Sequence, residues 1–322
     1  MRVSECPRPL AECLNVIGTG RVTPNGLVSA SLSGTDLNTM PHRNETLIFL
    51  HIPKTGGSTI YKVLERQYRR AQTLRLESPE IARFKTLPAA QRGQYRLIQG
   101  HLYFGLHRFI PRASTYITLL RRPVERVLSF YYYARSTPDH YLYSQLVTER
   151  LDLKTLLARG LTSELCNGQT RQLAGDEWED AQRVVTRAAL ERAQANLTHF
   201  RVVGLLEEFD ASVLLLRRAF SWHLPFYVKE NVTKEKPDET FLDAETHGLI
   251  EEANRLDLEL YQYARNLFDE HCRAAGDSFA EELCHFRRSN RASARPVPRF
   301  ARLLRRIGLY RAKIHNVLDE PN

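Results

Sequence analysis

Short apolar runs alternate with longer stretches of helical periodicity along the middle of the chain. The apolar runs, each short enough for a buried strand, cover residues 47–50, 95–98, 116–120 and 202–206. Helical spacing of apolar residues marks 60–70, 124–135, 151–158, 178–197, 211–220 and 244–271. Buried-type strands that alternate with helices predict an α/β fold, with a central, mainly parallel sheet flanked by helices.

The two ends of the chain lack this alternation, which predicts three segments. Residues 1–44 are rich in Ser, Gly, Thr, Asn and Pro, and we expect a flexible leader there. Residues 45–272 contain every predicted strand and form the expected single domain. Residues 273–322 are predicted to be a basic C-terminal tail.

The tail contains one amphipathic candidate helix, with arginines around an apolar face formed by Phe300, Leu303, Leu304, Ile307 and Ile314. Such a helix either docks on the core or lies on a membrane or an anionic polymer, and docking is favoured. No apolar run approaches the ~20 residues that span a bilayer, and no signal peptide is evident. The expected location is the cytoplasm, with peripheral membrane contact as the alternative for the tail.

Composition narrows the expected partners. The 322 residues have a formal net charge of +9, which favours anionic partners such as nucleotide phosphates or acidic glycans. The five scattered cysteines have no zinc-type spacing and suit a reducing compartment, although a Cys272–Cys284 bridge stays open. No metal site is predicted.

The first candidate for chemistry is the stretch LIFLHIPKTGGST at 47–59, where a strand meets a loop and then a helix. A loop of this kind presents backbone N–H groups at the positive end of a helix dipole and favours a phosphate. Lys54 adds a mobile positive charge, and Ser58 and Thr59 add hydroxyl donors. The lysine precedes Gly56 and Gly57, so this is not a Walker A loop. The alternative is a plain strand-to-helix turn with a surface lysine.

A second anion site is predicted where the run at 116–120 ends in Arg121, Arg122 and Pro123. Open α/β sheets bind ligands at the carboxyl ends of their strands. Ser129 lies eight residues after Arg121, two turns into the following helix. An arginine and a serine in this arrangement can hold one phosphate from two sides, unless the two arginines are only solvated surface charge.

His101 follows the run at 95–98 and is expected at the same edge of the sheet. A histidine there suits a general base acting on a hydroxyl group near neutral pH. His51 directly precedes the loop at the end of a buried strand, and we expect a structural role for it.

Together these motifs resemble the sulfotransferase family that includes heparan sulfate 2-O-sulfotransferase and related carbohydrate sulfotransferases. The similarity covers about residues 46–270 and includes the segments 167–175 and 203–207, and the Gly56-Gly57 pair resembles bacterial members. The resemblance implies a P-loop-like three-layer domain, with PAPS (3′-phosphoadenosine 5′-phosphosulfate) as co-substrate and no metal or nucleic acid.

The resemblance also implies roles for individual residues. The 5′-phosphosulfate would be held by Lys54, Thr55, Gly56, Gly57, Ser58 and Thr59. The 3′-phosphate would be held by Arg121 and Ser129, with Arg122 as the alternative arginine, and a later cofactor-side loop would contribute Thr233 and Lys236. Arg171 would be a cation facing the acceptor or the nucleotide.

The expected reaction is in-line sulfuryl transfer to a hydroxyl group, with His101 as base and Lys54 stabilising the departing phosphate. A carbohydrate is the favoured acceptor, ahead of a small metabolite or a protein tyrosine. Two other functions compete with this one. A nucleotide kinase would need a Walker A loop and a Mg²⁺ carboxylate, whereas a non-catalytic polyanion-binding module would need only the basic tail.

Overall fold

The computed structural model describes residues 45–175, 184–223, 227 and 242–293. The predicted leader, the candidate helix at 300–314 and the residues Thr233 and Lys236 lie outside these ranges.

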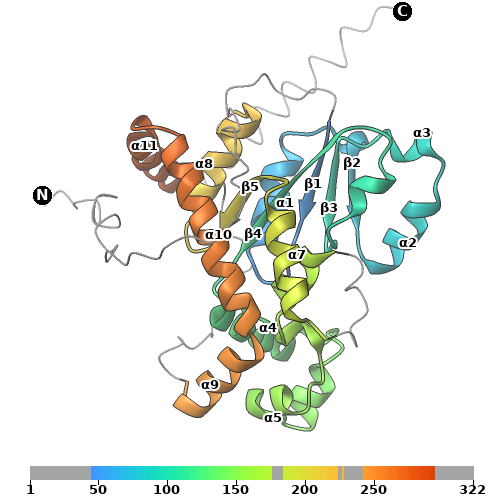
Figure 1. Ribbon diagram of the computed structural model, residues 1–322, viewed down its shortest axis with the longest axis vertical. Coiled ribbons are helices and arrows are strands. Elements are labelled where there is room, and N and C mark those ends of the chain that lie inside the picture. Colours follow the sequence, from blue (N-terminus) through green and yellow to red (C-terminus); the bar gives the residue numbers. More distant parts are fainter. Residues whose placement is uncertain (1–44, 176–183, 224–226, 228–241, 294–322) are drawn as a thin grey trace, which may run out of the picture.

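The described chain is built around a parallel sheet of five strands (Figure 1). The strands are β1 (Thr46–Leu50), β2 (Thr73–Leu76), β3 (Leu97–Gly100), β4 (Ser114–Leu120) and β5 (Phe200–Leu205), in the order β2-β3-β1-β4-β5. Every pairing is parallel. All carboxyl ends therefore meet at one edge, and the α/β prediction is confirmed.

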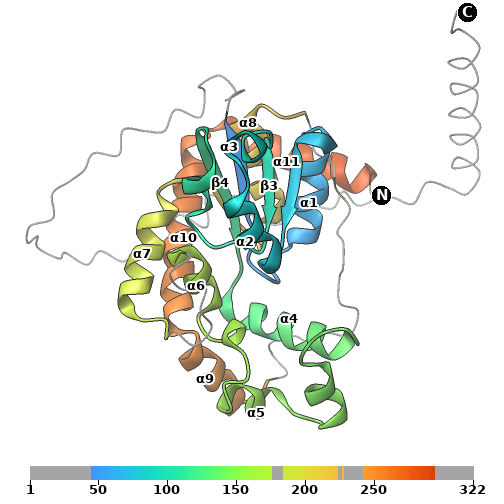
Figure 2. The same cartoon turned by 90° about the vertical axis from the view of Figure 1, so that its right-hand side faces the viewer.

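Helices cover both faces of this sheet and complete the three layers (Figure 2). One side carries α1 (Gly57–Glu65), and the other carries α7 (Arg187–Leu197) and α10 (Arg255–Ala274). β1 is buried along its whole length because it is the central strand. The apolar run at 47–50 has no polar alternation for the same reason.

A second, smaller core lies beyond the carboxyl edge of the sheet (Figure 1). It joins α4 (Pro123–Ser136), α5 (Leu153–Ala158) and α9 (Ala244–Ala253) through residues such as Val127, Leu156 and Ile250. The remaining α-helices are α2 (Ser78–Thr86), α3 (Ala89–Arg92), α6 (Gly168–Ala174), α8 (Phe209–Phe220) and α11 (Ser278–Ser293). The short helices are the π-helix η4 (Ser144–Thr148) and the 3₁₀ helices η2 (Arg70–Gln72), η3 (Leu106–Phe109) and η5 (Ser163–Leu165).

Three predicted helices differ from the observed ones. The helix predicted over 178–197 begins only at Arg187, since the described residues 184–186 before it are not helical. The stretch 244–271 is not one helix but α9 and α10, divided at Asn254. The buried Asn254 amide donates to the carbonyl oxygens of Leu165 (2.7 Å) and Ile250 (3.0 Å), which ties the break to a tertiary contact. The helix predicted to reach residue 70 ends at Glu65, and β2, which was not predicted, follows it.

The first part of the predicted tail packs on the domain. α11 lies against α8 and buries Phe279, Leu283 and Phe286 in the main core. Cys272 and Cys284 do not form a disulfide. None of the helices in the described part of the chain has the length and apolar character needed to cross a bilayer.

Candidate functional site

The carboxyl edge of the sheet brings together the three residues on which the predicted chemistry depends. Lys54 follows β1, His101 follows β3, and Arg121 follows β4. These strands are neighbours, and the register pairs Leu50 with Gly100. The sheet order therefore places a lysine, a histidine and an arginine along one edge, in agreement with the expectation for parallel strands.

The glycines of the loop are required by close contacts. Gly56 has φ +87°, and a Cβ there would lie 2.7 Å from Cδ1 of Leu206. A Cβ on Gly57 would lie 2.0 Å from Nε2 of His51. Gly56 is the N-cap of α1 and has no side chain to cap the helix, and no acidic residue lies in the first turn. The amino end of α1 is thus suited to an external anion.

The hydroxyl residues of the loop have unequal roles. The Thr55 side chain is buried and donates to the carbonyl oxygen of Ile52 at 2.8 Å, so it shapes the loop. Ser58 is half-buried, and Thr59 is buried in the first turn of α1.

Lys54 and Arg121 form a pair of cations above the loop. Nη1 of Arg121 donates to the carbonyl oxygen of Lys54 at 3.1 Å. Nζ of Lys54 lies 3.6 Å from the ring centroid of Tyr133. Burial, reinforced by the charge of Arg121, lowers the pKa of Lys54 to about 8. The site therefore holds positive charge that an anion would stabilise.

The structure separates the two adjacent arginines. The backbone of Arg121 exchanges hydrogen bonds with the Gln169 amide at 3.0 and 2.9 Å, and burial lowers the pKa of its guanidinium. The side chain of Arg122 is 55% exposed and pairs with Glu125 at 3.5 Å. Arg121 is therefore the arginine held within the site, and Ser129 is buried on α4.

His101 is oriented by a carboxylate that the sequence reasoning missed. Its Nδ1 lies 2.8 Å from Oε2 of Glu77, at the end of β2. This hydrogen bond is the main cause that lowers the pKa of Glu77. An ionised carboxylate can only accept, so Nδ1 is the donor and Nε2 is left to take a proton. No local motif marks Glu77, since its role depends on β2 pairing with β3.

Aromatic contacts close a ring of side chains around His101. The His51 ring lies beside that of His101, with centroids 4.7 Å apart and planes tilted by 33°, and Nδ1 of His51 lies 2.8 Å from the Tyr61 hydroxyl. Arg75 lies over the Tyr61 ring and pairs with Glu77 at 3.1 Å. Burial holds the pKa of His51 well below its ordinary value, so His51 packs as a neutral ring. This agrees with the structural role expected for it.

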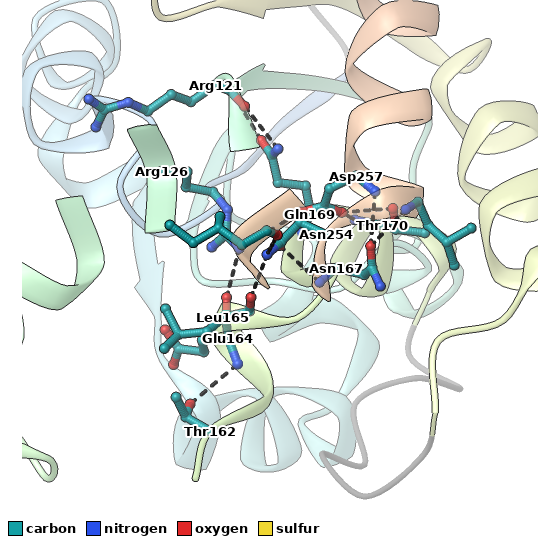
Figure 3. A network of polar contacts seen from close by, with 12 residues as sticks. Arg121, Arg126, Thr162, Glu164, Leu165, Asn167, Gln169, Thr170, Asn254 and Asp257 are labelled. Carbon is teal, nitrogen blue, oxygen red and sulfur yellow. Dashed lines mark hydrogen bonds and ion pairs between the residues drawn. The ribbon is translucent and has the colours of Figure 1, made fainter. Parts of the chain in front are cut away.

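A buried polar network fixes the position of the Arg121 backbone (Figure 3). Asp257 accepts from the backbone of Gln169 (3.1 Å) and Thr170 (2.7 Å) and lies 3.8 Å from Nη2 of Arg126. Arg126 donates to the carbonyl oxygen of Glu164 at 2.7 Å. The side chains of Arg126 and Asp257 are 1% and 0% exposed, so this network supports the site from within the protein.

Arg171 is only 6% exposed on α6, and its role towards the acceptor or the nucleotide stays a prediction. Thr233 and Lys236 lie outside the described residues. Within the described ranges, no three His, Cys, Asp or Glu side chains gather as metal ligands would.

Comparison with known proteins identifies the family. A family profile described as galactose-3-O-sulfotransferase matches residues 20–298. The pig protein galactose-3-O-sulfotransferase 2 is 25% identical over 250 residues, and the human protein galactose-3-O-sulfotransferase 3 is 27% identical over 260. These alignments cover 69% and 74% of this chain, and the chain spans 60% of the length of each relative.

A solved structure, mouse sulfotransferase SULT7A1 complexed with PAP, also shows similarity. It is 12% identical, with a TM-score of 0.35, over 70% of this chain and 92% of the mouse chain. A TM-score this low supports no argument about ligand or mechanism. The narrower predictions of a heparan sulfate 2-O type and of a bacterial source are not supported by the comparisons. The profile match covers most of the chain, which therefore belongs to the galactose-3-O-sulfotransferase family.

Proposed function

We propose that this chain transfers a sulfuryl group from PAPS to a hydroxyl group of a galactose-containing carbohydrate. The observation that carries the proposal is the cation pair of Lys54 and Arg121 beside the amino end of α1, whose first turn contains no acidic residue. Family membership supports the reaction class, and the names of the two mammalian relatives support galactose as the acceptor.

The residues present fit a nucleotide with two phosphate groups. Gly56 and Gly57 lie too close to their neighbours to carry a side chain. The loop is therefore bare at these positions, and an anion can reach its backbone. Lys54 and the loop N–H groups would hold the 5′-phosphosulfate, while Arg121 and Ser129 would hold the 3′-phosphate. When bound, PAPS supplies the sulfuryl group and leaves as adenosine 3′,5′-bisphosphate.

The side chains of this protein would then divide the work. Nε2 of His101 takes the proton of the acceptor hydroxyl as the new S–O bond forms and the bond to the 5′-phosphate breaks. Glu77 holds His101 in the required tautomer. Lys54 stabilises the charge that develops on the departing phosphate, and Arg121 fixes the register of the nucleotide.

Binding and turnover test this proposal together. We expect calorimetry to detect adenosine 3′,5′-bisphosphate without Mg²⁺, and labelled PAPS to transfer sulfate to a galactoside. Substituting His101→Ala should abolish transfer and leave nucleotide binding nearly intact, since His101 contacts only the acceptor hydroxyl in this scheme. Transfer that survives in His101→Ala would remove His101 as the base.

The same assays distinguish the two competing functions. Mg²⁺-dependent ATP binding would indicate a nucleotide kinase, and heparin binding without any nucleotide preference would indicate a polyanion-binding module. The cytoplasmic location and the peripheral membrane contact of the tail stay predictions from the sequence.

A further inference from the structure

Exposed aromatic side chains gather beside the predicted site. Among the described residues, the large apolar side chains that are exposed are Tyr133, Tyr141, Val147 and Val184. Tyr133 is 42% exposed and Tyr141 is 61% exposed. Tyr133 lies on α4, and Tyr141 follows it eight residues later. Exposed aromatic surface next to a candidate site is typical of ligand recognition.

These rings form a continuous surface that begins at Lys54. The Lys54 ammonium lies on the ring of Tyr133. The rings of His140 and Tyr133 are perpendicular, with a centroid distance of 5.7 Å and an interplanar angle of 90°, and His140 stacks on Tyr141 at 4.6 Å and 24°. Burial, followed by the charge of Lys54, lowers the pKa of His140. The rings therefore extend from the proposed reaction centre towards solvent.

Thr162 joins this aromatic surface to the backbone of Glu164. The Tyr141 hydroxyl lies 2.6 Å from Oγ1 of Thr162, which accepts from the backbone N–H of Glu164 at 3.3 Å. Arg126 holds the carbonyl oxygen of Glu164 from the other side, as Figure 3 shows. The backbone of Glu164 is thus held at both ends of the residue.

The Glu164 carboxylate lies near the proposed reaction centre. It lies within electrostatic range of Lys54 and His101, and burial raises its pKa. Among the described residues, this carboxylate has no hydrogen-bond or ion-pair partner, although its backbone has two. A carboxylate held in this way is suited to accept hydrogen bonds from a ligand's hydroxyl groups.

We propose that Tyr141, His140 and Glu164 form the subsite for a neutral hexopyranose ring of the acceptor. The inference rests on the proposed function, which makes that ring a galactoside. The apolar C–H face of the sugar stacks on Tyr141, and Glu164 accepts a hydrogen bond from a hydroxyl beside the reacting one. Because Glu164 repels negative charge, the subsite favours a neutral galactoside over a uronic acid, despite the chain's net charge of +9.

A matched pair of variants at Tyr141 tests the stacking surface. With saturating PAPS and lactose as the acceptor, Tyr141→Ala should raise the KM for lactose about tenfold, since a stacking contact worth about 1.4 kcal/mol is lost. The kcat and the affinity for adenosine 3′,5′-bisphosphate should stay unchanged. Tyr141→Phe keeps the ring and loses only the contact with Thr162, so its KM should stay close to that of the unmodified chain.

Glu164→Gln tests the charge of the subsite. It should raise the KM for lactose and reduce the discrimination against a galacturonoside, because the amide no longer repels the acceptor's carboxylate. A readout that does not depend on turnover is saturation-transfer NMR of lactose on the complex with adenosine 3′,5′-bisphosphate, where Tyr141→Ala should lose the signal.

The outcomes separate this inference from the proposed function. Intact nucleotide binding together with an unchanged lactose signal and KM in Tyr141→Ala would overturn the subsite alone. Absence of lactose binding to the unmodified complex would also overturn it. Failure of the unmodified chain to bind adenosine 3′,5′-bisphosphate would overturn the proposed function itself.

Discussion

At Lys54, a positive charge is held where water solvates it poorly. The half-buried ammonium contacts the Tyr133 ring, and the neighbouring Arg121 donates to its backbone carbonyl. Burial is the larger cause of its lowered pKa, and repulsion by Arg121 is the next. A bound phosphate would raise the pKa of Lys54 again, because an adjacent negative charge favours the ammonium form.

This predicts that nucleotide binding by Lys54 is linked to proton uptake. The pKa of about 8 in the ligand-free chain should rise when adenosine 3′,5′-bisphosphate binds. Affinity should therefore fall as pH rises above 8, by up to about tenfold per pH unit. Calorimetry at pH 8.5 in two buffers of different ionisation enthalpy measures the uptake.

The control for proton uptake is Lys54→Ala, which should bind more weakly with an affinity that no longer depends on pH in this range. Binding without proton uptake by the unmodified chain would place the phosphate away from Lys54.

At the scale of elements, the junction between β1 and α1 depends on side chains from other strands. His51, at the end of β1, occupies the volume that a side chain at Gly57 would need. The His51 ring also contacts that of His101 after β3, so the helix start, the loop and the proposed base share one packed unit. A change at Gly57 would therefore affect stability and His101 together.

Gly57→Ala is predicted to destabilise the domain by about 1–3 kcal/mol, the usual cost of overpacking. The reason is the 2.0 Å separation between a Cβ at this position and Nε2 of His51. The matched control is Gly248→Ala in the exposed face of α9, where a Cβ meets nothing within 4 Å. That change should be neutral or stabilise by about 0.5–1 kcal/mol through helix propensity. Thermal unfolding measures both, and equal melting temperatures would contradict the packing argument.

At the scale of the whole molecule, one buried carboxylate connects the elements around the site. Asp257 on α10 bonds to the backbone at the start of α6 and faces Arg126 on α4. Gln169 on α6 then bonds to the backbone of Arg121 after β4. The position of the proposed phosphate-binding arginine is therefore set by contacts between distant parts of the chain.

Asp257→Ala is expected to cost about 3–5 kcal/mol of unfolding free energy, because it leaves the Arg126 charge buried without a counter-charge. The control on the same helix is Glu259→Ala. Glu259 pairs with Arg187 at the surface, with side chains that are 43% and 62% exposed, and its removal should cost about 0–1 kcal/mol. Urea unfolding compares the two variants, and a similar small loss in both would show that the network adds little stability.

Local signals account for the part of the fold and site that was predictable. The apolar runs of β1, β3, β4 and β5 carry most of the sheet, and Gly56, Gly57 and Pro123 mark where helices begin. β2 was missed because its residues Thr73–Leu76 are only partly buried and lack a continuous apolar run. Glu77 was missed with it, since the residue acquires a role only when β2 pairs beside β3.

The sequence by itself determined the α/β class, the glycine-rich loop between the first strand and its helix, and the order of Lys54, His101 and Arg121 along the chain. These follow from periodicity, glycine and proline, which act over a few residues. Only the tertiary structure decided that Glu77 orients His101, that Arg121 and not Arg122 is held in the site, and that Asp257 stabilises Arg126. These pairings join residues far apart in the chain, and they depend on strand order and helix packing, which local patterns do not encode.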